Sequence, residues 1–317
     1  MIEVVARGLL STVQDAGRPG HRARGMPVAG AMDRLALAAA NVLAGNPPDA
    51  AAVELTLSGG AFRFDAPAHA ALAGADLSAT LDGAPLGAWG SFRAAEGCVL
   101  AFGAPRAGVR AYLAARGGIA VPAVLGSRAT YTRAGLGGLE GRALRPGDRL
   151  PLGRPRGAAP PAIALAPEAS PACGGAVTVR VMPGPQAERF GDAGLAAFLA
   201  TAWRVAPQND RMGYRLEGPA LPLPGGADIL TDPVLPGAVQ IANDGRPIVM
   251  MVDAQTTGGY AKIATVIGPD LRLVAQARAG ETIRFVACGQ AEAVEALRAE
   301  RAWIAGLAQL ARRREGA

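Results

Sequence analysis

One ten-residue segment gathers most of the polar groups that this sequence could use for chemistry. It reads Asp-Ala-Gln-Thr-Thr-Gly-Gly-Tyr-Ala-Lys at positions 253–262 and lies between two apolar runs of strand length. Threonine hydroxyls and unobstructed glycine N–H groups would lie close together there, which suits the oxygens of a carboxylate or a phosphate. The segment therefore predicts a working loop that binds a small anion through Thr256, Thr257, Gly258 and Gly259.

Lys262 closes this segment and is the one lysine among 32 basic residues. Burial can tune the pKa of a lysine amine, whereas arginine stays protonated, so a lone lysine is a candidate chemical group. Its amine would reach the bound anion and stabilise developing negative charge. We predict catalytic roles for Lys262, Gln255 and Tyr260. The alternative is a β-hairpin with a Gly-Gly turn whose polar residues only satisfy its own backbone.

A second polar cluster lies near the start of the chain, in a loop rich in Gly and Pro at positions 14–20. It contains Gln14 and Arg18, for which a purely structural role is less evident, and both are predicted to contact substrate. Asp33 follows shortly afterwards. This residue is expected either to cap a helix or to serve as a ligand.

A third cluster is centred on Arg211 and is followed by Asp232 and Gln240. The planar guanidinium of Arg211 could bind a carboxylate or phosphate with two hydrogen bonds. Because Asp210 precedes it, a solvated ion pair of little consequence is the alternative. Arg211 and Gln240 are predicted to contact substrate.

Other familiar catalytic arrangements do not occur in the sequence. His21 and His69 stand in no recognisable arrangement with a Ser or Cys nucleophile, and neither a Walker-type phosphate loop nor a dinucleotide fingerprint is present. Cys98, Cys173 and Cys288 are far apart and lack C-x-x-C spacing. Neither a metal site nor a disulfide framework is therefore predicted.

The elements that must position these residues are expected to be mainly β, in a β-rich α+β chain with few helices. The 317 residues are 50% hydrophobic and include 43 Gly and 25 Pro, which indicates many turns between short elements. Strand-like runs predominate in both halves. Helices are predicted at 33–43, near 193–201 and at 290–314, the last of which is expected to pack on the second domain.

A stretch rich in Pro, Ala and Gly suggests how the chain divides. We predict a β-rich N-terminal subdomain over 1–153, a linker over 154–175 and a C-terminal subdomain with a terminal helix over 176–317. No uncharged segment is long enough to cross a bilayer, and no secretory leader is recognisable, so we expect no membrane association and a cytoplasmic location.

The net charge limits the choice of partner. A formal charge of +6 could indicate nucleic acid, but the arginines are scattered and only 4% of residues are aromatic, so nucleic-acid binding is not expected. The basic balance suits a small anionic substrate or an acidic partner subunit, although an arginine-rich composition explains it equally well.

Several motifs together resemble one known family. They are Val-Gln-Asp-Ala-Gly-Arg-Pro-Gly at 13–20, Gly-Ala-Met-Asp at 30–33, Leu-Gly-Ser-Arg-Ala-Thr at 125–130, Asp-Arg-Met-Gly at 210–213 and the segment 255–262. The chain resembles the C subunits of 5-oxoprolinases, a family also known as allophanate hydrolase subunit 2, biotin-dependent carboxyltransferase or kinase A inhibitor antagonist. The matches run through nearly the whole chain.

The resemblance implies two β-barrel-like subdomains with cyclophilin-like character. It also implies a complex with A and B subunits in which ATP hydrolysis drives opening of the 5-oxoproline lactam to L-glutamate. ATP is expected in the complex, and biotin is not expected in this chain. One departure is Tyr260-Ala261-Lys262, where the family usually has Tyr-Pro-Lys.

Two other functions stay open. The chain could be the carboxyltransferase component of a biotin-dependent carboxylase of the urea type, with a separate carboxylase and biotin carrier. It could also be a regulatory binding protein that antagonises a kinase inhibitor.

Overall fold

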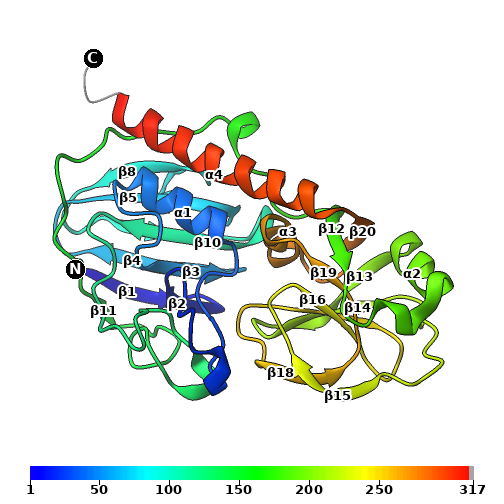
Figure 1. Cartoon of the computed structure of the whole chain (residues 1–317). Coiled ribbons are helices and arrows are strands. Elements are labelled where there is room, and N and C mark those ends of the chain that lie inside the picture. Colours follow the sequence, from blue (N-terminus) through cyan, green and yellow to red (C-terminus); the bar gives the residue numbers. More distant parts are fainter. Residues whose placement is uncertain (314–317) are drawn as a thin grey trace. The chain divides into compact units, whose positions relative to one another are not determined.

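The structure, a computed structural model that describes residues 1–313, confirms a mainly β chain with a long helix near its C-terminus (Figure 1). Contacts divide the chain into two units. The first comprises Met1–Arg18, Ala29–Cys173 and the chain from Arg301 onward, and the second comprises Pro19–Val28 and Gly174–Glu300. Most of the predicted linker thus groups with the first unit, where Ile163 is buried in an apolar cluster.

The first unit contains two antiparallel sheets that share one apolar core. The strands of one sheet are, in spatial order, β11 (Arg149–Leu150), β1 (Ile2–Arg7), β4 (Gly60–Phe64), β9 (Val99–Ala101), β6 (Thr80–Leu81) and β7 (Ala84–Pro85). Those of the other are β2 (Leu10–Gln14), β3 (Ala52–Thr56), β10 (Ala107–Ala115), β5 (Ala68–Asp76) and β8 (Gly90–Ala94). Val4, Phe62, Val53 and Leu113 from both sheets meet in the core. In this unit the strands form two sheets rather than one closed barrel.

Helix α1 (Arg34–Leu43) packs on β5 and β10 of the first unit. Its small and apolar residues, such as Ala36 and Leu37, are buried in a second apolar cluster. Asp33 stands at the N-cap and its Oδ1 accepts a hydrogen bond from the N–H of Ala36 at 2.9 Å. The helix-cap interpretation of Asp33 is therefore confirmed, because a capping carboxylate satisfies an N–H that the first turn leaves unpaired.

Helix α4 (Gln290–Arg313) confirms the predicted C-terminal helix, although Arg314 lies outside the described residues. Its last turns pack on the first unit, where Leu307 and Ala311 are buried in the cluster that contains α1. Trp303 meets Trp89 edge to face, with ring centroids 6.0 Å apart. The expectation that this helix packs on the second domain is wrong for these turns, because the apolar spacing predicts a buried face without saying what covers it.

The second unit is built on a closed barrel, which confirms the barrel expected for this half. The barrel strands are, in order, β12 (Val177–Pro183), β19 (Lys262–Val266), β16 (Ala238–Ile241), β17 (Pro247–Met250), β14 (Gly213–Glu217), β13 (Ala202–Asn209) and β20 (Thr282–Ala287). Only the β12–β20 pair that closes it is parallel. The barrel is accompanied by α2 (Gly191–Ala200) and α3 (Leu271–Gln276).

The second half of the polar segment before Lys262 is a strand rather than the expected loop, whereas residues 253–256 lie outside any strand. β18 (Thr257–Tyr260) pairs with β15 (Asp228–Pro233) in a separate two-stranded sheet, with Gly258 opposite Asp232. The alternative of a Gly-Gly hairpin turn is also wrong, since both glycines lie inside the strand. Glycine is depleted in strands but is used where neighbouring groups approach the backbone closely, which obscured this strand in the sequence.

Candidate functional site

The ammonium of Lys262 lies inside the second unit and is paired with one carboxylate. The lysine is the first residue of β19 and is 3% exposed. Its Nζ donates to Oδ2 of Asp232 on β15 at 2.7 Å, while the Asp232 side chain is 38% exposed. The hydrogen bond from Lys262, followed by one from Gln186, holds the pKa of the Asp232 carboxyl below its ordinary value. The Asp232 carboxylate therefore stays ionised throughout the neutral range.

Gln186 ties the two charged residues together. Its Nε2 donates to Asp232 Oδ2 at 3.1 Å, and its Oε1 accepts from the backbone N–H of Lys262 at 3.1 Å. The backbone N–H of Gln186 also donates to the carbonyl oxygen of Lys262. We call Lys262, Asp232 and Gln186 the Lys262 cluster. Because each member is bonded to the other two, the position of the ammonium is fixed by groups from three separate segments.

Gln240 lies beside this cluster on the neighbouring barrel strand. It pairs with Lys262 in the β16–β19 register, so the two side chains point to the same side of the sheet. Gln240 is 2% exposed, and its Nε2 is 3.4 Å from the carbonyl oxygen of Tyr260. The buried amide is therefore held where it could contact a molecule bound at Lys262.

Gly258 allows the side-chain amides of Gln240 and Gln255 to approach strand β18 closely. A Cβ on Gly258 would be 2.9 Å from Gln240 Nε2 and 3.5 Å from Gln255 Nε2. The structure thus brings Gln255, Gly258 and Gln240 together, and any larger residue than glycine would push against a buried amide. By contrast, a Cβ on the adjacent Gly259 would meet nothing closer than 3.6 Å.

The remaining predicted contacts of this segment lie along the same short sheet. Thr257 is exposed, while Thr256 and Tyr260 are partly exposed. Thr256 is anchored through its backbone, since its carbonyl oxygen accepts from the N–H of Val234 at 2.9 Å. Ala261, the departure from the usual proline, donates its N–H to the carbonyl oxygen of Ala227 at 2.9 Å. A proline could not make this hydrogen bond.

Arg211 is held in a buried ion pair, so the alternative of a solvated pair is wrong, while its predicted contact with substrate stays a prediction. Its Nε and a terminal nitrogen are 2.8 and 3.1 Å from the two carboxylate oxygens of Asp253. The side chains are only 7% and 5% exposed. The pair is neither solvated nor formed with Asp210, and the fork of the guanidinium faces a carboxylate of the protein.

Gln14 and Arg18 belong to the first unit and are fully buried there. Gln14 Nε2 donates to Thr12 Oγ1 at 3.0 Å and to the carbonyl oxygen of Thr130 at 3.1 Å. The Arg18 guanidinium donates to the carbonyl oxygen of Ala129. These contacts show that two motifs of the family resemblance, 13–20 and 125–130, are bonded to each other. The predicted substrate contacts of both residues stay predictions.

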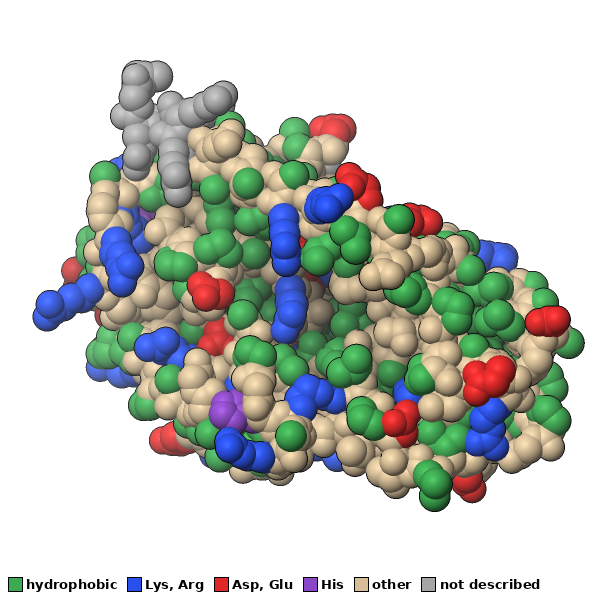
Figure 2. Space-filling view, in the orientation of Figure 1, with side chains coloured by type: hydrophobic (Ala, Val, Ile, Leu, Met, Phe, Trp, Pro, Cys, Tyr) green, Lys and Arg blue, Asp and Glu red, His purple; other side chains and the backbone are tan. Residues whose placement is uncertain are grey.

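Neither a cluster of metal ligands nor a membrane-spanning helix is found in the described part of the chain. Among residues 1–313, no group of three or more His, Cys, Asp or Glu side chains is arranged to hold a metal ion. No helix in that range is both long and apolar enough to cross a membrane. Lys and Arg side chains on the face shown in Figure 2 occur singly or in small groups among hydrophobic ones.

Sequence reasoning missed one member of the Lys262 cluster and undervalued another. Gln186 lies 76 positions from Lys262 and has no polar neighbours that mark it as part of a site. Asp232 was noted beside Gln240 but was not predicted to contact the lysine. A buried lone lysine requires a partner carboxylate, and that physical requirement was the one signal that could have pointed to Asp232.

The chain is thus a mainly β protein in which a closed barrel carries a buried ammonium bonded to Asp232. A family model for the carboxyltransferase domain, subdomains A and B, matches residues 24–287. The chain belongs to this family.

Relatives match this chain over most of its length. It is 39% identical to the C subunit of 5-oxoprolinase from Escherichia coli, across 97% of this chain and 98% of that protein. It is 35% identical to the protein of the same name from Haemophilus influenzae, across 93% and 94% of the two chains. Among solved structures, the K. lactis urea amidolyase has a TM-score of 0.87 and 29% identity over 96% of this chain, which spans 20% of that much longer enzyme.

Proposed function

We propose that this chain is the C subunit of an ATP-dependent 5-oxoprolinase, which opens the lactam of 5-oxoproline to L-glutamate together with A and B subunits. One observation carries the proposal. The similarity to the Escherichia coli 5-oxoprolinase protein extends over 98% of its length, so nearly every part of that protein has a counterpart here.

The Lys262 cluster supplies the chemistry that such a reaction needs. A lactam carbonyl is a poor electrophile, and coupling to ATP hydrolysis provides an activated, negatively charged intermediate. An ammonium group has three hydrogens, and the contact with Asp232 uses one of them. The other two can donate to an oxygen of the intermediate and stabilise charge that develops there.

Asp232 and Gln186 position the amine for this role. In the resting protein Asp232 balances the charge of the buried ammonium, which would otherwise be costly to keep away from water. Because Asp232 is 38% exposed, water can solvate its carboxylate when an anionic reactant takes up part of the ammonium's hydrogen bonding. Gln186 keeps the lysine backbone in place meanwhile.

The short β15–β18 sheet would line the same site. Thr256, Thr257 and the N–H groups of Gly258 and Gly259 donate to the reactant, and Gln255 and Tyr260 act beside Lys262. Gln240 contributes its amide from the barrel wall. For Arg211, the ion pair with Asp253 supports a role in holding the strand ends that carry the site.

Reconstitution tests the proposal directly. The chain is combined with purified A and B subunits, and ATP hydrolysis that depends on 5-oxoproline is measured with and without it. We expect turnover and L-glutamate formation only when all three are present. Full activity of the A and B subunits without this chain, or no activity of the three together, would overturn the proposal.

A second candidate function is a carboxyltransferase component of a urea-type carboxylase. The TM-score of 0.87 with the K. lactis urea amidolyase favours it, although this chain spans only a fifth of that enzyme. Supplying a carboxylated biotin carrier together with urea tests this candidate. Transfer of the carboxyl group to urea, without activity on 5-oxoproline, would support it over the first.

A further inference from the structure

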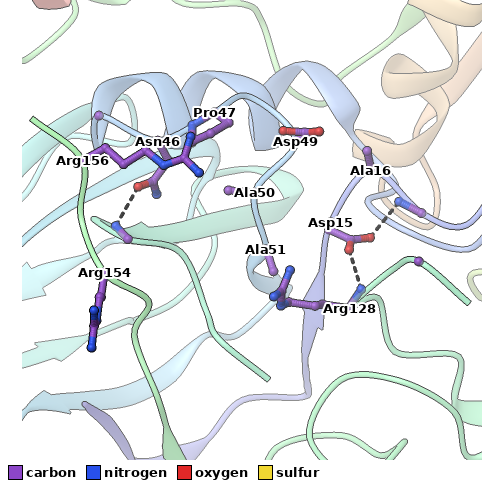
Figure 3. Close-up of a pocket in the computed structure, with 14 residues that line it drawn as sticks. Asp15, Ala16, Asn46, Pro47, Asp49, Ala50, Ala51, Arg128, Arg154 and Arg156 are labelled. Carbon is purple, nitrogen blue, oxygen red and sulfur yellow. Dashed lines mark hydrogen bonds between the residues drawn. The ribbon is translucent and has the colours of Figure 1, made fainter. Parts of the chain in front are cut away.

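A pocket in the first unit is lined by arginines that the proposed function does not use. Its volume is about 430 Å³ and it is bordered by the turn after α1, the loop at Gly126 and the segment after β11. Figure 3 shows Arg128, Arg154 and Arg156 at this pocket, from two segments of the chain. The volume falls within the roughly 300–1,000 Å³ of small-molecule pockets.

These arginines are not paired with carboxylates, unlike several other arginines of the same unit. Within residues 1–313, neither Arg154 nor Arg156 forms an ion pair or a side-chain hydrogen bond. Elsewhere in the unit, Arg63, Arg142 and Arg149 are all paired with carboxylates at 2.5–2.7 Å. In the same described range, the side chain of Arg128 donates only through its Nε, to the carbonyl oxygen of Val121. Its two terminal nitrogens are therefore available to a ligand.

The backbone that carries Arg154 and Arg156 is fixed rather than free. Gly153 packs so closely against Gly117 that a Cβ on either glycine would lie within 2.4 Å of the other's carbonyl oxygen. Downstream, the Arg116 guanidinium donates to the carbonyl oxygens of Arg156 and Gly157, both at 2.6 Å. Asn46 Oδ1 in turn accepts from the N–H of Gly117 at 2.8 Å. The backbone that carries the two arginines is thus held beside the pocket at both of its ends.

Arg128 is positioned by the carboxylate of Asp15, which accepts three hydrogen bonds. Asp15 Oδ2 accepts from the N–H of Arg128 at 2.5 Å, and Oδ1 accepts from the N–H of Gly17 at 2.8 Å (Figure 3). Oδ1 also accepts from Ser127 Oγ at 2.6 Å. These three donors fix the Asp15 carboxylate in place, and the charges of the three arginines offset its negative charge. Asp49, exposed at the rim, is the acidic lining residue without such partners in the described chain.

We propose that this pocket binds a small anion with at least two negative charges, of phosphate or carboxylate type. Guanidinium groups pair with both kinds of oxyanion through two parallel hydrogen bonds. The lining includes Ala16, Ala50, Ala51 and Gly126, which are small and leave room for a compact ligand. The proposal goes beyond the proposed function, since it concerns other residues and requires no partner subunit.

Calorimetric titration of the full-length chain tests the site, with inorganic phosphate, pyrophosphate and citrate as separate probes. We expect at least one to bind saturably, and binding to weaken as ionic strength rises. A preference for pyrophosphate assigns a phosphate-bearing ligand, and a preference for citrate assigns a polycarboxylate. The Arg154→Ala/Arg156→Ala double variant should bind at least tenfold more weakly, and Arg128→Ala roughly tenfold more weakly.

Two control variants sharpen the test. Arg93→Ala removes an exposed arginine on β8 that does not line the pocket, and should leave affinity unchanged. Asp49→Asn removes the opposing charge at the rim and should strengthen binding several-fold. Absence of saturable binding of all three probes would overturn the proposal. It would also be overturned by equal affinity in the double variant and the wild type, or by equal weakening in Arg93→Ala.

Discussion

Replacing Arg211 should cost the second unit a large part of its stability. Arg211→Met leaves Asp253 only 5% exposed and removes the guanidinium from both of its oxygens. Breaking a buried pair in this way typically costs about 3–5 kcal/mol, because the remaining carboxylate loses two hydrogen bonds and stays buried. Domains are stable by only about 5–15 kcal/mol in total, so the variant should lose about a fifth of that stability or more.

Urea unfolding monitored by circular dichroism measures this loss. We expect a lower midpoint for Arg211→Met with little change in the slope against urea. As a control, Arg204→Met removes an ion pair with Glu217 whose side chains are 66% and 36% exposed, and should stay within about 1 kcal/mol of the wild type. The double variant Arg211→Met/Asp253→Leu should recover much of the loss, since an apolar pair can replace a buried ion pair.

The opposite pattern would refute this reasoning about Arg211. If Arg211→Met unfolded at the wild-type urea concentration but needed much more substrate for half-maximal activity, the guanidinium would serve substrate binding rather than the ion pair with Asp253. The same buried contact would then have contributed nothing to stability.

Three further predictions concern the Lys262 cluster and its neighbours. Gln186→Leu should lower the turnover of the reconstituted complex while assembly is retained, because the lysine backbone loses its acceptor; unchanged turnover would contradict this. Asp232→Asn should be less stable than the wild type at neutral pH. The wild type should lose this advantage as the pH falls through the lowered pKa of folded Asp232, so the unfolding midpoints of the two proteins should converge in acid. Gly258→Ala should reduce activity and cost about 1–3 kcal/mol by crowding a buried amide, whereas Gly259→Ala should have little effect on either measurement.

The sequence predicted most barrel strands because their apolar alternation is local. The two apolar runs beside the polar segment were expected to be strands, and they form β17 and β19, the second of which begins at Lys262. Asp33 as a helix cap was also within reach, since capping depends on residues three positions apart. The features that were predicted correctly depend on residues that are close together in the sequence.

What the sequence did not predict depends on distant contacts. β18 is held by pairing with β15, and its two glycines argue against a strand when taken alone. Gln186 and Asp232 reach Lys262 from 76 and 30 positions away, and the partner of Arg211 lies 42 positions away. The face of α4 was predictable as buried, whereas the surface that buries its last turns was not.

The activity of Lys262→Met in the complex reconstituted with A and B subunits is the most direct test of the central claim, that the buried ammonium stabilises an anionic reactant. Loss of a preorganised donor of this kind lowers turnover by roughly 10²–10³-fold. We expect a loss of at least that size in 5-oxoproline-dependent ATP hydrolysis, with subunit assembly intact. Turnover close to that of the wild type would contradict the claim.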